Sequence, residues 1–167
     1  MKEDLIKLAE AIKDIKMTML TTVGDDGCLI SRPMATLRID EDKFDGKIYF
    51  FTDKSSPKVL NISSDQNVNL AYAEPGKQKY ISVAGTAGLV QDKALMASLW
   101  TPAMKAWFPE GLLDPNLGLI CVEVVTAELW DSPPSKVVQL VGIAKALATG
   151  QRYNGEKHQH HFDVRGH

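Results

Sequence analysis

Residues 17–39 read MTMLTTVGDDGCLISRPMATLRI, and this stretch has the pattern of a β-hairpin. Residues 17–23 are rich in Thr, Met and Leu and predict a first strand. The GDDG sequence at residues 24–27 indicates a tight turn, because glycine adopts positive φ values at little cost. Residues 28–39 predict the second strand, and a further acidic turn leads to a third strand at residues 47–52.

The chain on either side of the hairpin alternates short β patterns with turns and helical patterns. Three further strands are predicted at residues 68–73, 80–90 and 119–130. Helices are predicted at residues 5–15, from residue 57 onward, at 92–100, around 104–108 and at 137–147. Gly85 and Gly88 indicate a bend or bulge in the long fifth strand. Six strands with peripheral helices predict a mainly β (β+α) fold, an antiparallel barrel rather than a βαβ sheet.

The size and composition of the chain favour one domain. Its 167 residues, 44% of them hydrophobic, suit a single compact core at residues 1–150. Residues 151–167 are polar and predict a flexible tail. All four histidines lie in this tail, among them His158, His160 and His161, but a flexible segment does not fix metal ligands in space, so we expect no metal site.

The charge and apolar patterns exclude several classes of partner. The net charge of −2 gives no reason to expect a basic stripe for nucleic acid. No apolar run approaches the roughly 18 residues of a membrane helix, and the charged N-terminus is unlike a signal peptide. These features predict a cytoplasmic protein. Cys28 and Cys121 have no CxxC partner and are expected to be small buried apolar side chains.

Residues 50–58, FFTDKSSPK, have the pattern of an anion site. A strand ends, and a helix begins with Ser56 as its N-cap and Pro57 at its first position. Free N–H groups at a helix start, together with the hydroxyls of Ser55 and Ser56 and the ammonium of Lys58, suit a phosphate. The alternative is a capped helix with a solvated lysine.

Arg32 in the second hairpin strand is a further candidate. The neighbouring Pro33 lacks a donor for the sheet, which indicates an edge, a bulge or a ligand site. The planar guanidinium of arginine suits phosphate, although a surface arginine on an exposed strand would have the same sequence. Aromatic residues gather in the C-terminal half, where they would stack on a flat heterocycle or pack in a core or interface: Trp100, Trp107, Phe108 and Trp130.

In their order and spacing, these segments resemble the FMN-binding split barrels, the superfamily of pyridoxamine 5′-phosphate oxidase. Within it they are most similar to the general stress protein 26 branch, of which residues 107–111 and 114–115 are typical. The resemblance covers residues 5–150. It implies a six-stranded split barrel that binds FMN, with FAD as the alternative, in a homodimer whose flavin sites lie at the interface.

The resemblance also implies roles for individual residues. Ser56 and Lys58 match the positions that hold the FMN phosphate, and Trp130 matches a tryptophan that approaches the flavin from the partner subunit. The full set of expected cofactor-binding residues is Arg32, Pro33, Met34, Ala35, Phe51, Thr52, Ser55, Ser56, Lys58 and Trp130. No catalytic side chain is expected, because the flavin carries the redox chemistry.

The sequence departs from the oxidase at several positions. Pro57 replaces an arginine that contacts the phosphate, and Tyr80 replaces a glutamine that contacts the flavin. Leu37 stands where the oxidase has a basic residue for its substrate phosphate. The substrate is therefore not expected to be pyridoxamine phosphate.

Three functional readings follow from the resemblance. The first is a flavin oxidoreductase acting on a small unknown molecule, with NAD(P)H as a candidate reductant. The second is a stress or sensing protein that binds flavin without turnover. The third is a haem-binding split barrel.

Overall fold

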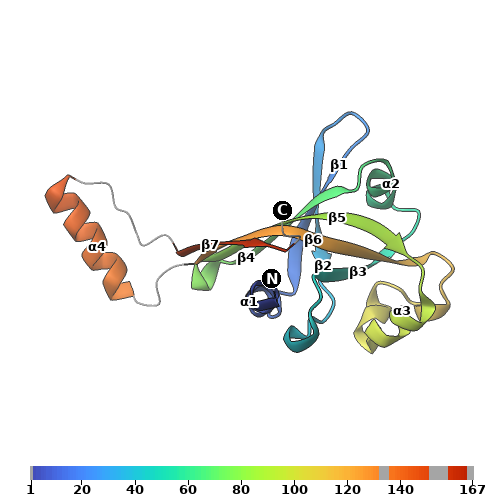
Figure 1. The fold of residues 1–167 in the computed structure, drawn as a ribbon. Coiled ribbons are helices and arrows are strands. Elements are labelled where there is room, and N and C mark those ends of the chain that lie inside the picture. The colour runs from blue at the N-terminus through green and yellow to red at the C-terminus, as the bar shows by residue number, and fades with distance from the viewer. Residues whose placement is uncertain (1, 132–135, 151–157, 165–167) are drawn as a thin grey trace.

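The computed structural model describes residues 2–131, 136–150 and 158–164 (Figure 1). Its strands are β1 (Met17–Val23), β2 (Leu29–Ala35), β3 (Lys47–Asp53), β4 (Asn67–Glu74), β5 (Lys79–Val90), β6 (Leu117–Asp131) and β7 (His158–Asp163). Its α-helices are α1 (Lys2–Ile12), α2 (Pro57–Ser64), α3 (Lys93–Leu99) and α4 (Lys136–Thr149). Short 3-10 turns are η1 (Glu41–Lys43), η2 (Pro75–Lys77), η3 (Pro102–Ala106) and η4 (Gly111–Leu113).

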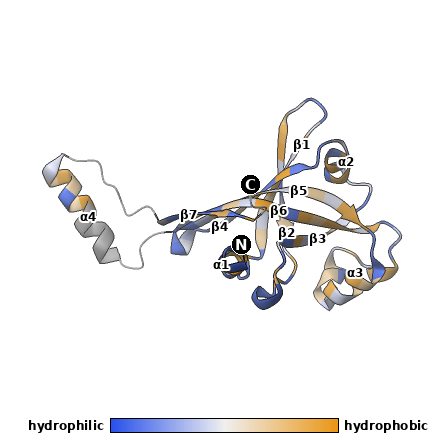
Figure 2. Ribbon diagram, in the orientation of Figure 1, coloured by the Kyte–Doolittle hydropathy of each residue, from blue (hydrophilic) through white to orange (hydrophobic). Residues whose placement is uncertain are grey.

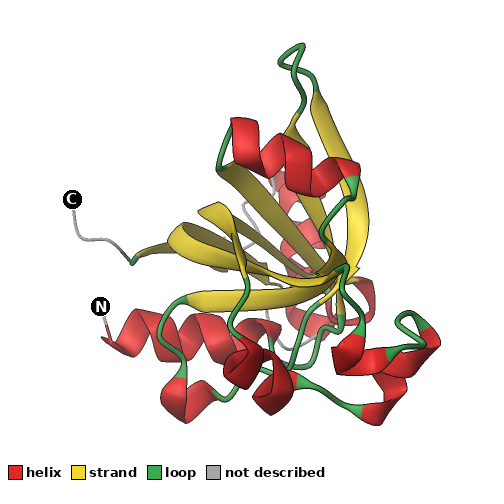
Figure 3. Ribbon diagram, turned by 90° about the vertical axis from the view of Figure 1, so that its right-hand side faces the viewer, coloured by secondary structure: helices red, strands yellow, loops and turns green. Residues whose placement is uncertain are grey.

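Six strands pair antiparallel in the order β2-β1-β4-β5-β6-β3, and β7 pairs antiparallel with β6 outside this order. The sheet is curled rather than flat (Figure 3), so its two ends approach each other. Just beyond β2, the N–H of Leu37 donates to the carbonyl of Tyr49 on β3, 3.1 Å away. The expected six-stranded split β-barrel with peripheral helices is therefore confirmed.

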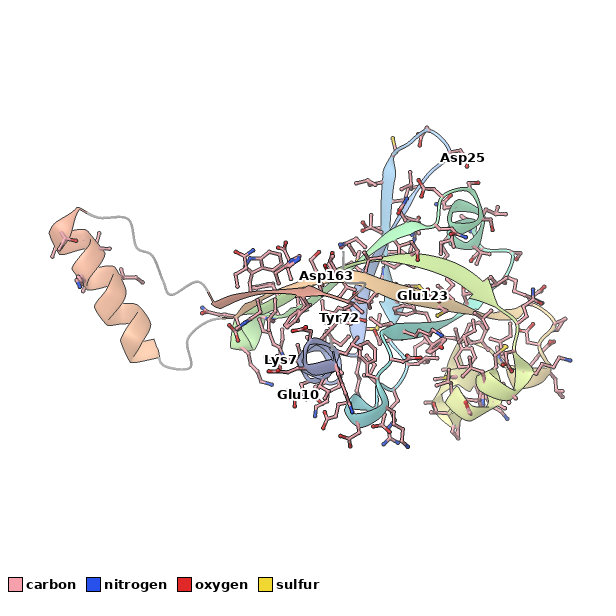
Figure 4. The ribbon with its side chains drawn as sticks, in the orientation of Figure 1. Lys7, Glu10, Asp25, Tyr72, Glu123 and Asp163 are labelled. Carbon is pink, nitrogen blue, oxygen red and sulfur yellow. The ribbon has the colours of Figure 1, made fainter. Side chains whose placement is uncertain are left out.

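The inner side of the curled sheet holds the main core. Strand β1 alternates as the side-chain period of two requires, with Thr18, Leu20 and Thr22 buried. Tyr72 of β4 lies inside the fold (Figure 4) and shares a 3.0 Å hydrogen bond with the hydroxyl of Thr36. Apolar residues of the central strands (Figure 2) and the buried face of α1 complete this core.

The predicted irregularity in β5 is present at Gly85. The register of β5 against β6 shifts between Ala84 and Gly85. A Cβ atom at Gly85 would lie 2.5 Å from the backbone oxygen of Glu123, closer than any side chain tolerates. Glycine is thus required for the bulge. Gly88 has no neighbour within 4 Å of such a Cβ and lies in regular strand.

The hairpin differs from its prediction at Cys28, which is exposed instead of buried, whereas Cys121 is buried as expected. Cys28 belongs to the turn: its N–H donates to Asp26 Oδ1 at 3.0 Å, and its carbonyl accepts from the N–H of Gly24 at 2.8 Å. Strand β2 consequently begins at Leu29. It ends at Ala35, four residues before the predicted end.

The expectation of a flexible tail is wrong for residues 158–163, which form β7. Strand β6 carries β3 along its first half and β7 along its second half. An open sheet edge offers unpaired backbone groups, and β7 pairs with them while Phe162 enters the core. Of the histidines in β7, His160 stacks on Phe162 and His161 faces Glu128.

Helix α4 connects the ends of β6 and β7 through residues outside the described set and stands apart from the sheet (Figure 1). Among its described side chains, Ile143 and Leu147 are exposed. Within the described residues, no helix has both the length and the apolar character that a membrane span needs.

Candidate functional site

The hairpin arginine and the start of α2 meet on the inner side of the sheet. Arg32 pairs with Leu20 of β1 in the sheet register, so the two side chains share a face. Its Nη1 donates to Thr22 Oγ1 at 2.7 Å and to the carbonyl of Leu20 at 3.3 Å. Burial lowers the pKa of the Arg32 guanidinium, which marks a cation partly withdrawn from water.

Lys58 stands in the first turn of α2, beside this arginine. Burial is the main cause that lowers the pKa of its ammonium, and the positive charge of Arg32 lowers it further, against a smaller opposing effect of Asp53. Among the described residues, neither cation makes an ion pair with a carboxylate. Two partly buried like charges that make no direct ion pair among the described residues form a site suited to an anion.

Ser56 and Thr52 add hydroxyls next to the cations. Ser56 occupies the predicted N-cap position of α2, but its side chain makes no capping hydrogen bond. Its Oγ lies 3.3 Å from the hydroxyl of Thr52, a buried residue at the end of β3. The Ser56 hydroxyl is therefore not occupied by the helix backbone, as it would be in an ordinary cap.

The sequence predicts the Ser55 hydroxyl as a phosphate ligand, and in the structure this hydroxyl forms a hydrogen bond within the protein. Its hydroxyl and its N–H both donate to Asp53 Oδ1, at 2.6 and 2.7 Å. These two bonds are the main causes that lower the pKa of the Asp53 carboxyl. Ser55 thus holds the loop before α2, and its hydroxyl is occupied by the protein itself.

Two residues that the sequence did not indicate complete the site. The Thr22 hydroxyl accepts both from Arg32 and from Asn61 Nδ2, the latter at 3.1 Å. Asn61 lies three residues after Lys58, on the same face of α2. Asn61 is a polar residue on the helix face that also carries Val59 and Ile62. This position and its spacing from Lys58 are the sequence signal that points to Asn61.

The residues expected beside the flavin ring divide between the two sides of the sheet. Met34 is buried in the main core. Phe51 is buried in a second cluster, where its ring meets Trp100 edge-on with centroids 5.3 Å apart and Phe108 at 6.4 Å. Pro33 and Ala35 are exposed on the outer face of β2, opposite to Arg32.

Trp130 does not join the site within one protomer. It pairs with Tyr80 on the outer face, whereas Arg32 faces inward. The described residues therefore bring together Arg32, Lys58, Ser56 and Thr52 but not Trp130.

Comparison with known proteins gives the family of the chain. The family model described as pyridoxamine 5′-phosphate oxidase like matches residues 3–154. Protein bli-3 of Neurospora crassa is 31% identical over 145 residues, which cover 81% of this chain and 68% of that protein.

Solved structures of similar proteins have the same fold. The general stress FMN/FAD binding protein of Xanthomonas citri is 31% identical, with a TM-score of 0.68 over 81% of this chain and 93% of that one. A putative general stress protein 26 from Jannaschia, 24% identical, shares the fold over 98% of this chain and 99% of its own, with a TM-score of 0.72. With a family model matching nearly the whole domain, the chain belongs to the pyridoxamine 5′-phosphate oxidase-like family.

Proposed function

We propose that this protein binds FMN non-covalently and is a flavin-dependent oxidoreductase acting on a small molecule. The observation that carries the proposal is the pair of partly buried cations, Arg32 and Lys58, without a carboxylate partner among the described residues. A phosphate monoester is close to a dianion at neutral pH and compensates both charges. The similarity to a general stress FMN/FAD binding protein supports a flavin as the molecule that carries it.

FMN is favoured over FAD by the charges of this site. The terminal phosphate of FMN carries nearly two negative charges, whereas each phosphate of the FAD diphosphate bridge carries one. Two cations without an ion-pair partner among the described residues, with a Ser56 hydroxyl that caps no backbone N–H, match the terminal phosphate better. FAD is the alternative.

The residues of this chain would act as ligands rather than as catalysts. Bound FMN supplies hydride transfer at its N5 atom. Arg32, Lys58 and Ser56 would hold the phosphate, Thr52 would orient Ser56, and the backbone of residues 33–35 and 51–52 would border the ring. NAD(P)H is the proposed reductant, and a cytoplasmic location stays a prediction from the sequence.

The assembly that we propose is a homodimer formed through the outer face of the sheet. This outer apolar face consists of exposed residues on five neighbouring strands: Met17, Met19, Pro33, Ala35, Ala71, Ala73, Tyr80 and Trp130. Contiguous exposed apolar surface of this kind is unusual for a monomer and typical of an interface. A second copy would cover it and bring its own Trp130 toward the flavin site.

Flavin titrations test the proposal. Flavin-free protein is titrated with FMN and with riboflavin, which lacks the phosphate, by quenching of flavin fluorescence. We expect Lys58→Met and Arg32→Met to weaken FMN binding by about a hundredfold, because each removes a charged hydrogen bond, and to leave riboflavin binding unchanged. Lys43→Met, which removes an exposed surface lysine, is the control.

The spectrum then separates the functional readings. Bleaching of the bound flavin by NADPH without air would support the oxidoreductase. A bound flavin that NADPH does not reduce would favour the stress or sensing protein. A haem spectrum, or protein that binds no flavin at all, would overturn the proposal.

A further inference from the structure

The hydroxyl of Thr22 links the three elements that build the anion site. Thr22 is on β1 and is completely buried. Its Oγ1 accepts from Nη1 of Arg32 on β2 at 2.7 Å and from Nδ2 of Asn61 on α2 at 3.1 Å. Both bonds are formed by protein groups alone, so this bridge is part of the fold before any ligand binds.

The bridge determines which part of the guanidinium is free. Arginine has five N–H donors in a rigid plane. Nη1 is occupied by Thr22 Oγ1 and the carbonyl of Leu20. Within the described part of the chain, Nε and Nη2 have no hydrogen-bond partner, which leaves one edge of the plane for a two-point contact with an anion.

A bridge of this kind is needed because the charges oppose the arrangement. Arg32 and Lys58 repel each other, and without support the long arginine side chain would turn toward water. Asn61 lies on the same helix face as Lys58, so the bridge joins the helix that carries Lys58 to the hydroxyl that holds Arg32. The protein thereby holds the site in its binding geometry in advance.

We propose that Thr22 and Asn61 are positioning residues for the phosphate of the flavin: they fix Arg32 through Nη1 and so keep its opposite edge open. The inference rests on the proposed FMN function and adds to it two residues that do not touch the cofactor. It predicts an effect on the phosphate part of binding alone.

The test measures the ratio of FMN affinity to riboflavin affinity in flavin-free protein. We expect Thr22→Val to reduce this ratio about tenfold, because the guanidinium loses its neutral acceptor, and Thr22→Ser to restore it. Thr18→Val is the matched control, since Thr18 is buried on the same face of the same strand outside the bridge. General distortion of the fold would weaken both flavins equally and leave the ratio unchanged.

Asn61→Ala provides a second, independent variant if Thr22→Val does not fold, and it should also lower the ratio. A wild-type protein that binds FMN better than riboflavin, with variants that keep the wild-type ratio, would overturn the positioning role and leave the proposed function standing. A wild-type protein without any preference for FMN would instead overturn the proposed function.

Discussion

The positive charge of Arg32 lowers the pKa of the Lys58 ammonium. On an ordinary protein surface, solvent would separate two such cations. The sheet hairpin carries one cation and the first turn of α2 carries the other, and burial acts on each in the same direction. A fold selected for stability alone would avoid this arrangement. The cost is understandable if the two charges serve a bound anion.

Replacing Lys58 by methionine should therefore separate stability from binding. Lys58→Met removes a partly desolvated and repelled charge, so we expect the flavin-free protein to gain about 0.5–1 kcal/mol, a range limited by solvent screening of this half-exposed group. FMN affinity should fall at the same time. Urea unfolding of the flavin-free variant and wild type measures the first effect.

The pH dependence of this stability difference follows from the direction of the pKa shift. A lysine whose pKa is lowered in the folded state destabilises it while both states are protonated. As the pH rises through the lowered pKa toward the ordinary value of 10.5, the folded state releases its proton first and the cost disappears. The advantage of Lys58→Met should shrink on the alkaline side. An advantage that grows there would contradict the assigned cause.

The regular part of the fold could be predicted because turn residues and side-chain periods are local signals. Five of the six expected strands lie within two residues of their observed bounds at both ends, and Asp92 caps α3 as expected. Strand β7 could not be predicted in this way. It forms because β6 extends beyond β3 and leaves an open edge, a long-range condition that a polar, histidine-rich segment does not reveal.

The site was predictable where the residue type itself carries the chemistry, as in Arg32 and Lys58. The hydroxyl–amide bridge from Thr22 to Asn61 was not, because a threonine in a strand and an asparagine in a helix carry no distinctive pattern. The role of Ser55 also depends on geometry, since its hydroxyl donates to Asp53. The conformation of the loop determines which hydroxyls are available to a ligand. Sequence spacing does not define that conformation.

Substitution by alanine should affect the stability of the protein at one helix start and not at another. Asp92 accepts from the N–H groups of Ala94 and Leu95, at 2.9 and 3.0 Å, so Asp92→Ala should cost about 1 kcal/mol of unfolding free energy. Ser56→Ala removes a hydroxyl that caps nothing and should change stability by less than about 0.5 kcal/mol. It should weaken FMN binding roughly tenfold. Thermal unfolding and flavin titration together check this contrast; a large stability loss in Ser56→Ala would show that its hydroxyl is structural.

A charge placed on the outer apolar face should dissociate the proposed dimer. Met19 is 41% exposed in the protomer and lies on this face, between β2 and β4. Met19→Asp would bury an unpaired carboxylate at the interface, so we expect the dissociation constant to rise at least about a hundredfold, with loss of bound FMN. Leu113→Asp, at a 90% exposed site in η4, is the control. Sedimentation velocity gives the answer, and a Met19→Asp protein that stays dimeric would place the interface elsewhere.

The bulge in β5 offers a test of the fold that does not depend on the flavin. A methyl group at Gly85 would meet the backbone oxygen of Glu123 at 2.5 Å, and that oxygen cannot move without displacing β6. Gly85→Ala should therefore lower the free energy of unfolding by about 1–3 kcal/mol, the usual range for overpacking. Gly88→Ala, three residues along the same strand with nothing within 4 Å, should be neutral or gain up to about 1 kcal/mol from a less flexible unfolded chain. Equal effects of the two substitutions in urea unfolding would mean that Gly85 is tolerated for its flexibility and not required by the close approach of β6.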